Sequence, residues 1–241
     1  MKLPVLLFSL ACAVSTFAAN IVLIGDSTLA PRTEKVKLGS WGDALKASMV
    51  EGNGIVNCAV GGRTVRTTLP KWKDYLGKIQ KGDYVIIQFG INDASPRKLV
   101  EEAEFKKTLV QFTDDVVAKG ATPILCGPVS NGGYSKKAKP DAKFVQTKSR
   151  RTYADYTKQV ADEKKFAFVD MTALTGAELE KRGKDEALAL FTGDTTKKDD
   201  KGVEKPIFDT CHPNKAGAKR FAELFIADVK ARKLPVAALF K

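Results

Sequence analysis

The sequence is poor in the residues that most often carry acid–base and metal chemistry. It has a single histidine, His212, among 241 residues. Because an imidazole is the usual base at neutral pH, a serine or cysteine hydrolase built from this chain has one candidate base of that type. The acidic residues Asp194, Asp199 and Asp200 form a cluster, but they lack the spacing and the glycine of a calcium-binding loop.

Cysteines are also few, and their spacing is unlike that of a zinc site. Of the four, Cys12 falls in an N-terminal segment that we expect to be removed, which leaves Cys58, Cys126 and Cys211. Three thiols cannot all pair with one another, so at least one is free or bonds to another chain. A bridge between Cys58 and Cys211 is one option, because each lies beside a motif described below. We expect neither a metal site nor a cofactor.

The chain has no apolar run long enough to anchor it in a bilayer. At the start, Lys2 precedes a short apolar run, and small residues surround Ala18. This pattern is typical of a secretory signal peptide, here residues 1–18; the alternatives are a first strand of the fold or a lipid attached to Cys12. The signal predicts a secreted protein, extracellular or periplasmic, with no membrane anchor after cleavage. Residues 19–241 are expected to form a single domain.

Acidic residues are in the minority. The 28 Asp and Glu residues are outnumbered by 40 Lys and Arg residues, which gives a net charge of +12. A basic surface attracts polyanions, and both nucleic acid and an acidic polysaccharide are candidates. The alternative is a lysine-rich surface that is simply solvated, and the charge alone does not decide between these interpretations.

The hydrophobic pattern alternates between short β-rich runs and longer segments with helical spacing. Alternating strands and helices predict an α/β protein with a parallel sheet covered by helices on both faces. In such sheets ligands bind at the carboxyl ends of the strands. The expected strands are 21–24, 54–60, 84–89, 123–126 and 166–169, and the expected helices are 41–50, 99–119, 150–164 and 214–232.

Two long polar loops are expected at this same edge of the sheet. They are Ser130–Lys148, which contains several lysines, and Thr192–Pro206. Binding residues are often carried on loops that a rigid scaffold positions. Both loops are therefore candidate walls of a substrate site, with mobile surface loops as the alternative.

Four strand-end segments together supply the groups that acyl transfer by a serine requires. Ser27 follows the first strand and can open a helix, which would turn its backbone N–H into the site. Asp209 lies three residues before His212, so it can orient the imidazole toward Ser27. The glycines at 61–62 bring backbone N–H groups close to a ligand, and Asn92 offers a side-chain N–H. None of these motifs alone is specific for a serine hydrolase, but the occurrence of all four in this order along the chain is specific.

In that order the motifs Gly25-Asp26-Ser27, Gly61-Gly62, Gly90-x-Asn92-Asp93 and Asp209-x-x-His212 resemble the four blocks of the SGNH (GDSL-like) hydrolases. Within that superfamily the chain is similar to rhamnogalacturonan acetylesterases over nearly all of its length after residue 18. The similarity rests on residues 25–30, 41–42, 56–64, 82–90 and 212–217.

The resemblance implies a three-layer α/β/α, flavodoxin-like fold with a five-stranded parallel sheet in the order 2-1-3-4-5. It also implies a catalytic triad of Ser27, His212 and Asp209. The oxyanion hole would consist of the N–H groups of Ser27 and Gly62 and the side chain of Asn92. The chain departs from the family at Ile91, where a histidine is common, and at Cys58, which replaces a polar or acidic residue; both put the identity of the sugar in doubt.

These features predict an exported esterase that removes acetyl groups from a plant cell-wall polysaccharide, pectic rhamnogalacturonan. The basic residues Arg63, Arg66, Lys136 and Lys137 are expected to attract the acidic polymer. We expect a monomer with no nucleic-acid partner. The alternatives are an esterase, lipase or xylan acetylesterase of the same superfamily and, in another class, a non-catalytic module that binds polyanions.

Overall fold

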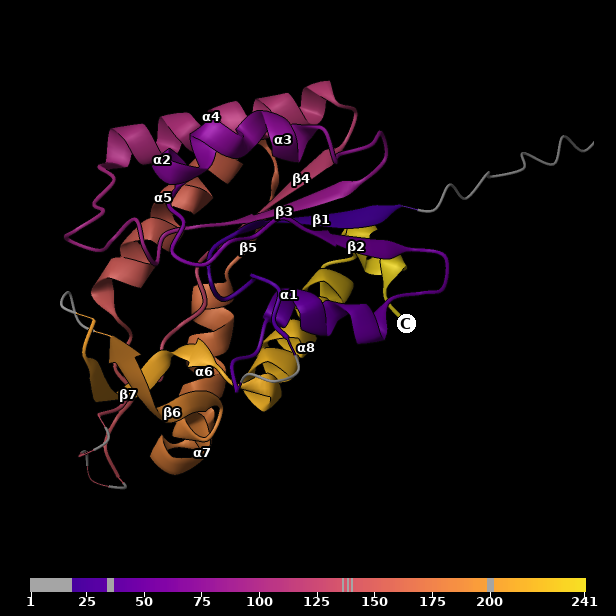
Figure 1. Cartoon of the computed structure of the whole chain (residues 1–241). Coiled ribbons are helices and arrows are strands. Elements are labelled where there is room, and N and C mark those ends of the chain that lie inside the picture. Colours follow the sequence, from indigo (N-terminus) through magenta and orange to yellow (C-terminus); the bar gives the residue numbers. More distant parts are fainter. Residues whose placement is uncertain (1–18, 34–36, 136, 138, 140, 199–201) are drawn as a thin grey trace, which may run out of the picture.

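A five-stranded parallel sheet forms the centre of the molecule (Figure 1). The computed structural model describes residues 19–33, 37–135, 137, 139, 141–198 and 202–241; the expected signal segment, residues 1–18, lies outside them. The strands are β1 (Asn20–Gly25), β2 (Gly54–Asn57), β3 (Tyr84–Gln88), β4 (Thr122–Cys126) and β5 (Ala167–Val169). Their order is β2-β1-β3-β4-β5, so the predicted fold class and strand order are confirmed.

Helices cover both faces of the sheet. On one face lie α2 (Val65–Thr68), α3 (Trp72–Leu76), α4 (Glu102–Ala118) and α5 (Lys148–Lys164), and on the other lie α1 (Trp41–Ala44), α6 (Met171–Arg182), α7 (Lys184–Leu188) and α8 (Lys215–Ala231) (Figure 1). Short 3-10 helices follow three of these segments, at Leu45–Ser48, Leu69–Lys71 and Pro235–Leu239.

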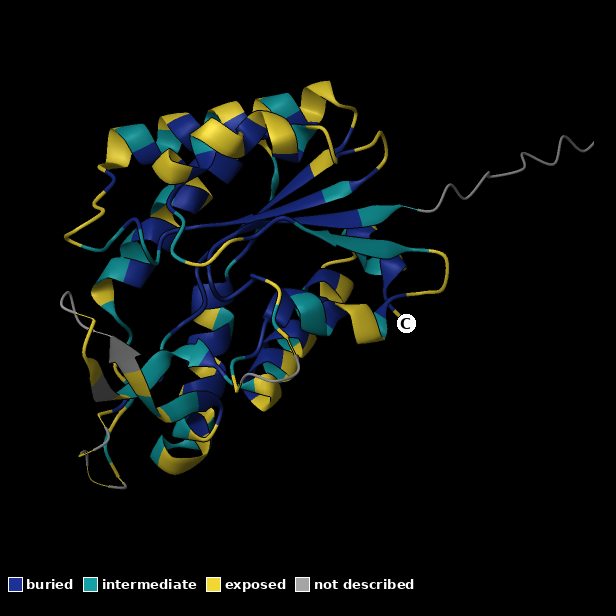
Figure 2. Ribbon diagram, in the orientation of Figure 1, coloured by how far each residue is buried: buried dark blue, intermediate teal, exposed yellow. Residues whose placement is uncertain are grey.

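The apolar strands explain why two helical layers are needed. Side chains alternate along a strand, so Ile21 and Leu23 enter one core while Val22 and Ile24 enter the other, all with no exposed surface. Burying each such side chain contributes roughly 1.5–3 kcal/mol. Figure 2 shows the centre of the sheet as buried, with exposed residues on the outer sides of the helices, in the connecting loops and on the hairpin near residue 200.

Helix α4 shows how the amphipathic pattern selects its packing face. Phe105, Leu109, Phe112 and Val116 recur at helical spacing and are at most 1% exposed. The ring of Phe112 stacks on Trp72 of α3 with a centroid distance of 3.9 Å. The predicted helix 99–119 therefore corresponds to the observed α4, with its ends shifted by one to three residues.

The structure differs most from the sequence-based expectations after residue 190. The expected loop Thr192–Pro206 is largely an antiparallel hairpin of β6 (Phe191–Lys198) and β7 (Glu204–Pro213). Apart from its ends, Phe191 and Pro213, the described side chains of this two-stranded ribbon are half-buried or exposed. Its sequence therefore lacks the apolar alternation that reveals other strands. Helix α6 was also missed, although Asp170 accepts a hydrogen bond from the Ala173 N–H and caps its start.

The other long loop has a supporting role. The Gly132 N–H donates to the Thr210 carbonyl oxygen at 2.8 Å, so Ser130–Lys148 packs against strand β7. The predicted helix 41–50 is shorter than expected and continues as the 3-10 helix Leu45–Ser48. In the part of the chain that the structure describes, no helix combines the length and apolar character needed to cross a membrane.

Candidate active site

Ser27 lies in a tight turn immediately after β1. The Asp26 carbonyl oxygen accepts hydrogen bonds from the N–H groups of Leu29 (3.2 Å) and Ala30 (2.9 Å). This single turn does not continue into a helix, since the next helix begins at Trp41. The expectation that Ser27 opens a helix is therefore wrong, and its N–H owes its direction to the turn alone.

A buried chain of hydrogen bonds holds this turn from below. Both the N–H and the hydroxyl of Thr28 donate to Asp26 Oδ1, at 3.0 and 2.9 Å. Gln88 Nε2 donates to the Thr28 hydroxyl at 2.7 Å, and Trp41 Nε1 donates to Gln88 Oε1 at 3.0 Å. All four side chains are fully buried. Burial raises the pKa of Asp26, an effect that its hydrogen bonds to Thr28 only partly offset.

The three predicted triad residues come together at the carboxyl edge of the sheet. His212 Nε2 lies 3.0 Å from Ser27 Oγ, and His212 Nδ1 lies 2.8 Å from Asp209 Oδ2. The other Asp209 oxygen accepts the backbone N–H groups of Cys211 (2.8 Å) and His212 (3.0 Å). Burial raises the pKa of Asp209, but the hydrogen bonds from the His212 ring and from these N–H groups outweigh it and leave the pKa below its usual range.

This geometry suits proton transfer from Ser27. An ionised Asp209 accepts from the His212 Nδ1–H and leaves Nε2 as the acceptor that faces the serine hydroxyl. Strand β7 carries both residues, and it is fixed at its end, where the Gly39 N–H donates to the Pro213 carbonyl at 2.8 Å. Arg150, 6% exposed, donates to Cys211 Sγ at 3.1 Å and supports the strand from behind.

The predicted oxyanion donors lie on the three turns that follow β1, β2 and β3. Gly62 adopts φ +76°, a conformation that favours glycine. A Cβ added to the preceding Gly61 would lie 3.8 Å from Ser27 Cβ, so this loop runs beside the nucleophile. Among the described residues, none accepts a hydrogen bond from the N–H of Ser27 or Gly62. Asn92 uses one N–H to donate to the Arg63 carbonyl at 3.1 Å, which leaves its second N–H available.

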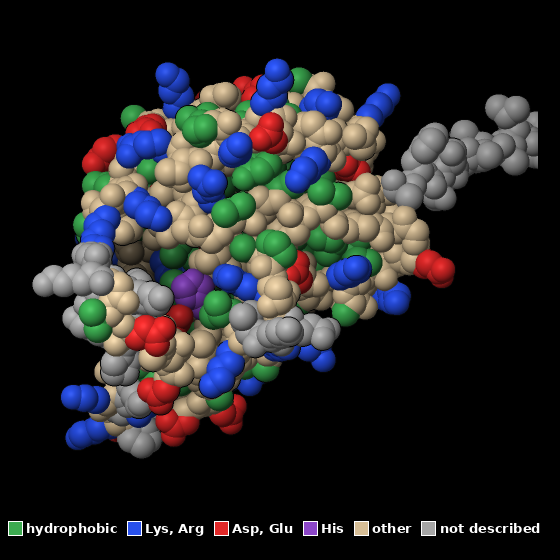
Figure 3. Space-filling model, viewed as in Figure 1, with side chains coloured by type: hydrophobic (Ala, Val, Ile, Leu, Met, Phe, Trp, Pro, Cys, Tyr) green, Lys and Arg blue, Asp and Glu red, His purple; other side chains and the backbone are tan. Residues whose placement is uncertain are grey.

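A pocket of about 670 Å³ opens over these groups. The histidine, purple in Figure 3, lies at a hollow of the surface. The hairpin β6–β7 forms one wall of this pocket, as expected for the segment that follows Thr192. The lining residues are Ser27, Lys37, Leu38, Ile91, Asn92, Thr192, Thr195, Thr196, Ile207, Asp209, Cys211 and His212.

Three of the four basic residues predicted to bind substrate, all of them described by the structure, do not line this pocket. Arg66 is paired with Glu104 of α4, with Nε 2.6 Å from Oε1, and Arg63 donates to the Thr67 carbonyl at 3.0 Å on the exposed side of α2. Lys137 is exposed in the loop behind β7, and Lys136 lies outside the described residues. With 40 basic residues in the chain, sequence position alone does not distinguish those near a site.

Two other lysines lie close to the chemistry. Lys37 lines the pocket, and Lys98 Nζ donates to the Gly62 carbonyl oxygen at 2.8 Å. Neither stands in a motif, so the only available signal was the position of Lys98 six residues after Asn92, on the same loop. Lys37 thus places positive charge in the pocket and Lys98 places it beside the Gly62 loop, whereas Arg66 does neither.

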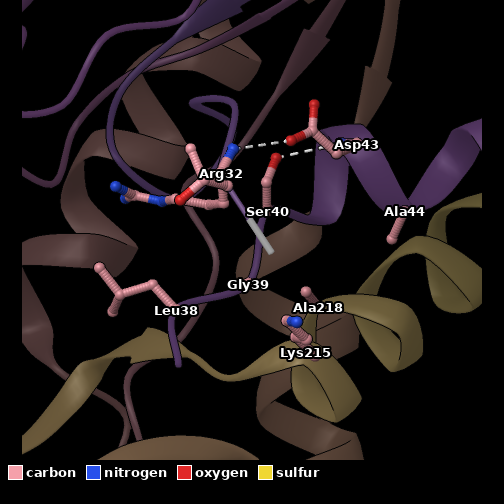
Figure 4. A pocket seen from close by; sticks show the side chains of 9 residues that line it. Arg32, Leu38, Gly39, Ser40, Asp43, Ala44, Lys215 and Ala218 are labelled. Carbon is pink, nitrogen blue, oxygen red and sulfur yellow. Dashed lines mark hydrogen bonds between the residues drawn. The ribbon is translucent and has the colours of Figure 1, made fainter. Parts of the chain in front are cut away.

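A smaller cavity of about 200 Å³ adjoins the pocket and shares Leu38 with it (Figure 4). The Arg32 N–H donates to Asp43 Oδ2 at 3.0 Å, and Ser40 Oγ accepts the Asp43 N–H at 3.0 Å. Arg32 Nη2 also donates to the Ser27 carbonyl oxygen at 2.5 Å. These contacts tie the nucleophile turn to the start of α1.

The three described cysteines are all free thiols, so the bridge considered between Cys58 and Cys211 is not formed. Cys58 and Cys126 are buried, and burial raises the pKa of both thiols. Cys211 lines the pocket beside His212.

Comparison with known proteins shows which family and which relatives the chain resembles. The model of the family "GDSL-like Lipase/Acylhydrolase" matches residues 21–225. The probable rhamnogalacturonan acetylesterase YesY of Bacillus subtilis is 27% identical over 225 residues, which cover 91% of this chain and 96% of that protein. The rhamnogalacturonan acetylesterase RhgT of the same organism is 26% identical over 220 residues, 90% of this chain and 92% of its own length.

A solved structure shows the same fold. The crystal structure of protein YxiM from Bacillus subtilis superposes with a TM-score of 0.74 at 27% identity, covering 90% of this chain and 57% of that one. The family model spans more than half of the sequence. The chain therefore belongs to the GDSL-like lipase and acylhydrolase family.

Proposed function

We propose that this protein is a carbohydrate esterase that removes acetyl groups from pectic rhamnogalacturonan. The observation that carries the proposal is the hydrogen-bonded series Ser27–His212–Asp209, which opens into a pocket of about 670 Å³. The similarity to the rhamnogalacturonan acetylesterase RhgT and to the probable rhamnogalacturonan acetylesterase YesY, along nearly the whole chain, supports the choice of polymer.

The reaction uses Ser27 as the nucleophile and His212 as the base. His212 Nε2 accepts the hydroxyl proton while Ser27 Oγ bonds to the acetyl carbonyl carbon. The tetrahedral intermediate collapses, the bond from carbon to the sugar oxygen breaks, and His212 returns the proton to that oxygen. Water then attacks the acetylated Ser27 by the same proton transfers, which releases acetate and restores the serine.

Three donors receive the negative charge that develops on the carbonyl oxygen. They are the N–H groups of Ser27 and Gly62 and the free side-chain N–H of Asn92. Because the donors are fixed before the substrate binds, their reorganisation costs little, and one such donor typically contributes about 3 kcal/mol to transition-state stabilisation.

The pocket walls favour a sugar over a long acyl chain. Thr192, Thr195 and Thr196 provide hydroxyl groups from the hairpin, while Leu38, Ile91 and Ile207 provide small apolar surfaces that suit the faces of sugar rings. The positive charge of Lys37 in the pocket, and that of Lys98 beside the Gly62 loop, would attract the uronic acid carboxylates of an acidic polymer. A lipase would instead require a continuous apolar channel for its acyl chain.

Acetate release tests the proposal. We expect the wild type to deacetylate rhamnogalacturonan, and Ser27→Ala to lower the rate at least about 10⁴-fold, because the nucleophile is lost while binding remains. Ser135→Ala, which changes an exposed serine in the loop behind β7, should leave the rate unchanged.

The substrates distinguish the alternatives. Activity on acetylated xylan, but not on the pectic polymer, would replace rhamnogalacturonan with xylan. Activity only on a small chromogenic acetate would keep the hydrolase and discard the polysaccharide. A wild type that binds pectin, has no activity on any ester and is unaffected by Ser27→Ala would show a binding module instead.

A further inference from the structure

Asp93 is a fully buried carboxylate at the junction of two loops that carry oxyanion donors. Its Oδ1 accepts the Val65 N–H at 2.9 Å, and its Oδ2 accepts the Gly90 N–H at 2.9 Å. Val65 begins α2, directly after the loop that contains Gly62. Gly90 begins the loop that contains Asn92. One side chain therefore links both loops through their backbones.

Neighbouring contacts strengthen the same link. Asn92 Nδ2 donates to the Arg63 carbonyl at 3.1 Å, and Lys98 Nζ donates to the Gly62 carbonyl at 2.8 Å. The Asp93 backbone is itself held, since its carbonyl oxygen accepts the Val100 N–H (3.0 Å) and the Tyr153 hydroxyl (2.9 Å). The loop after β3 is thus fixed on one side, and on the other side it forms hydrogen bonds with residues 62–65.

We propose that Asp93 is a positioning residue for the oxyanion hole, setting the separation of the Gly62 N–H and the Asn92 side chain without touching the substrate. Asp93 has no exposed surface and is absent from the pocket lining. The inference rests on the proposed function, because it assigns Asp93 a part in the same esterase reaction.

The physical basis is the geometry that oxyanion stabilisation requires. Donors act at about 2.7–3.1 Å from the developing charge, so a small displacement of one loop weakens the interaction. An asparagine at position 93 keeps one acceptor oxygen and presents an NH₂ group to the second backbone N–H. That second bond is lost, and the two donors face each other repulsively. We therefore expect Asp93→Asn to lower kcat about 10–100-fold while KM changes less than about 3-fold.

The pH profile supplies a readout that a loss of stability does not imitate. Burial raises the pKa of Asp93 to about 7, and the nearby Asp26 charge acts in the same direction, against the hydrogen bonds from Val65 and Gly90. The other titratable groups near it are Tyr153 of α5 and Arg66 of α2. As the pH falls through 7, Asp93 gains a proton and one acceptor becomes a hydroxyl, which breaks a bond to one loop.

Two ionisations then shape the acid side of the wild-type profile. His212 must be neutral to act as the base, and Asp93 must be charged to hold the loops. We expect log(kcat/KM) for a chromogenic acetate to fall with a slope approaching two below neutral pH in the wild type, and with a slope of one in Asp93→Asn.

Asp83 provides a matched control. It is also a buried aspartate, 2% exposed, that accepts two backbone N–H groups, from Asn20 (3.0 Å) and Gln80 (2.8 Å). It precedes β3, at the end of the strand opposite to Asp93. Asp83→Asn should lower the unfolding temperature as Asp93→Asn does, but leave kcat and the slope of the pH profile unchanged.

A double-mutant cycle with Asn92→Ala tests the route of the effect. If Asp93 acts through the oxyanion donors, Asp93→Asn should lower kcat less than about 3-fold once Asn92 is already truncated. Each of three results would overturn the proposal. One is a kcat for Asp93→Asn within about 3-fold of wild type, and another is a loss of kcat in Asp83→Asn equal to that in Asp93→Asn. The third is a double mutant whose loss of kcat equals the product of the two single-mutant losses.

The wild-type profile and Ser27→Ala complete the design. Should Asp93→Asn fail to fold, a wild-type acid limb of slope one would overturn the inference and a slope approaching two would support it. If Ser27→Ala loses activity but Asp93→Asn has the kinetics of the wild type, only this inference is overturned. If the wild type itself has no esterase activity, the proposed function is overturned instead.

Discussion

At the scale of single residues, Asp209 is the side chain whose two oxygens have separate tasks. One oxygen accepts from the His212 ring, and the other accepts two backbone N–H groups from the same short segment. The carboxylate is therefore fixed before it orients the imidazole. The pairing of Asp209 with the His212 ring spans only four consecutive residues, which is why the spacing Asp209-x-x-His212 was sufficient to predict that pairing from the sequence. The bonds of the other oxygen to the backbone were not predicted.

The role of Asp209 can be tested by Asp209→Asn. The asparagine amide favours the imidazole tautomer with its proton on Nε2, which cannot accept from Ser27. We expect kcat on a chromogenic acetate to fall about 10³–10⁴-fold, with KM within a few-fold. Asp155→Asn, at an exposed ion pair with Arg151 on α5, is the control. A kcat for Asp209→Asn within about 10-fold of wild type would contradict the assigned role.

The basic residues near the site could not be identified correctly from the sequence. Arg66 follows the Gly62 motif closely in the sequence, yet Glu104, on a helix far along the chain, holds its guanidinium on the outer surface. Lys37 lines the pocket although it belongs to no motif. Motif spacing constrains only local geometry, whereas the direction of a long basic side chain depends on partners distant in sequence.

At the scale of elements, the segments that are most buried were predicted most accurately from the sequence. The strands of the central sheet are apolar on both faces, so their positions could be predicted to within a few residues. The hairpin β6–β7 carries two of the three triad residues but buries few side chains, and most of it, Thr192–Pro206, was expected to be a loop. Its register is fixed by the pairing of Gly193 with Asp209, a long-range contact that no local pattern encodes.

An ion-pair cluster connects two elements of the outer layer. Glu178 of α6 accepts from Arg220 of α8 at 2.8 and 3.0 Å, and from Arg182 at 2.7 Å. The hydrogen bonds from Arg220, followed by those from Arg182, lower the pKa of Glu178 to about 2 against the opposing effect of burial. Because the folded-state pKa lies below the unfolded value, the pair stabilises the fold above about pH 4.5 and ceases to do so as the pH falls toward 2.

Glu178→Gln tests this contribution. At pH 7 we expect the free energy of unfolding to fall by roughly 1–3 kcal/mol, because Arg220 and Arg182 lose a carboxylate that is only 9% exposed. Between pH 4.5 and 2 the difference from wild type should shrink, which thermal or urea unfolding at several pH values would measure. The exposed Glu163→Gln on α5 serves as the control. A difference that stays constant down to pH 2 would contradict the assignment.

At the scale of the whole molecule, the excess of basic residues is the dominant property. The net charge is +12, and Figure 3 shows Lys and Arg side chains spread over the face that contains the histidine. Such a field raises the local concentration of an acidic polymer and accelerates its association. Charges separated by more than about 10 Å are largely screened at 0.1 M salt, so any contribution of the field must depend on ionic strength.

The salt dependence of kcat/KM therefore distinguishes electrostatic attraction of the polymer by the whole surface from the chemistry at Ser27. We expect kcat/KM for acetylated rhamnogalacturonan to fall about 3–10-fold when salt rises from about 0.02 to 0.3 M, because the field that attracts the polymer is screened. A small neutral chromogenic acetate uses the same triad without that field, so its kcat/KM should change little. Lys37→Met should weaken the salt dependence for the polymer and leave the neutral ester unaffected, since Lys37 lines the pocket beyond the triad. Neutral acetylated xylan cleaved as efficiently as the pectic polymer, with the same salt dependence, would show that the positive charge does not select the substrate.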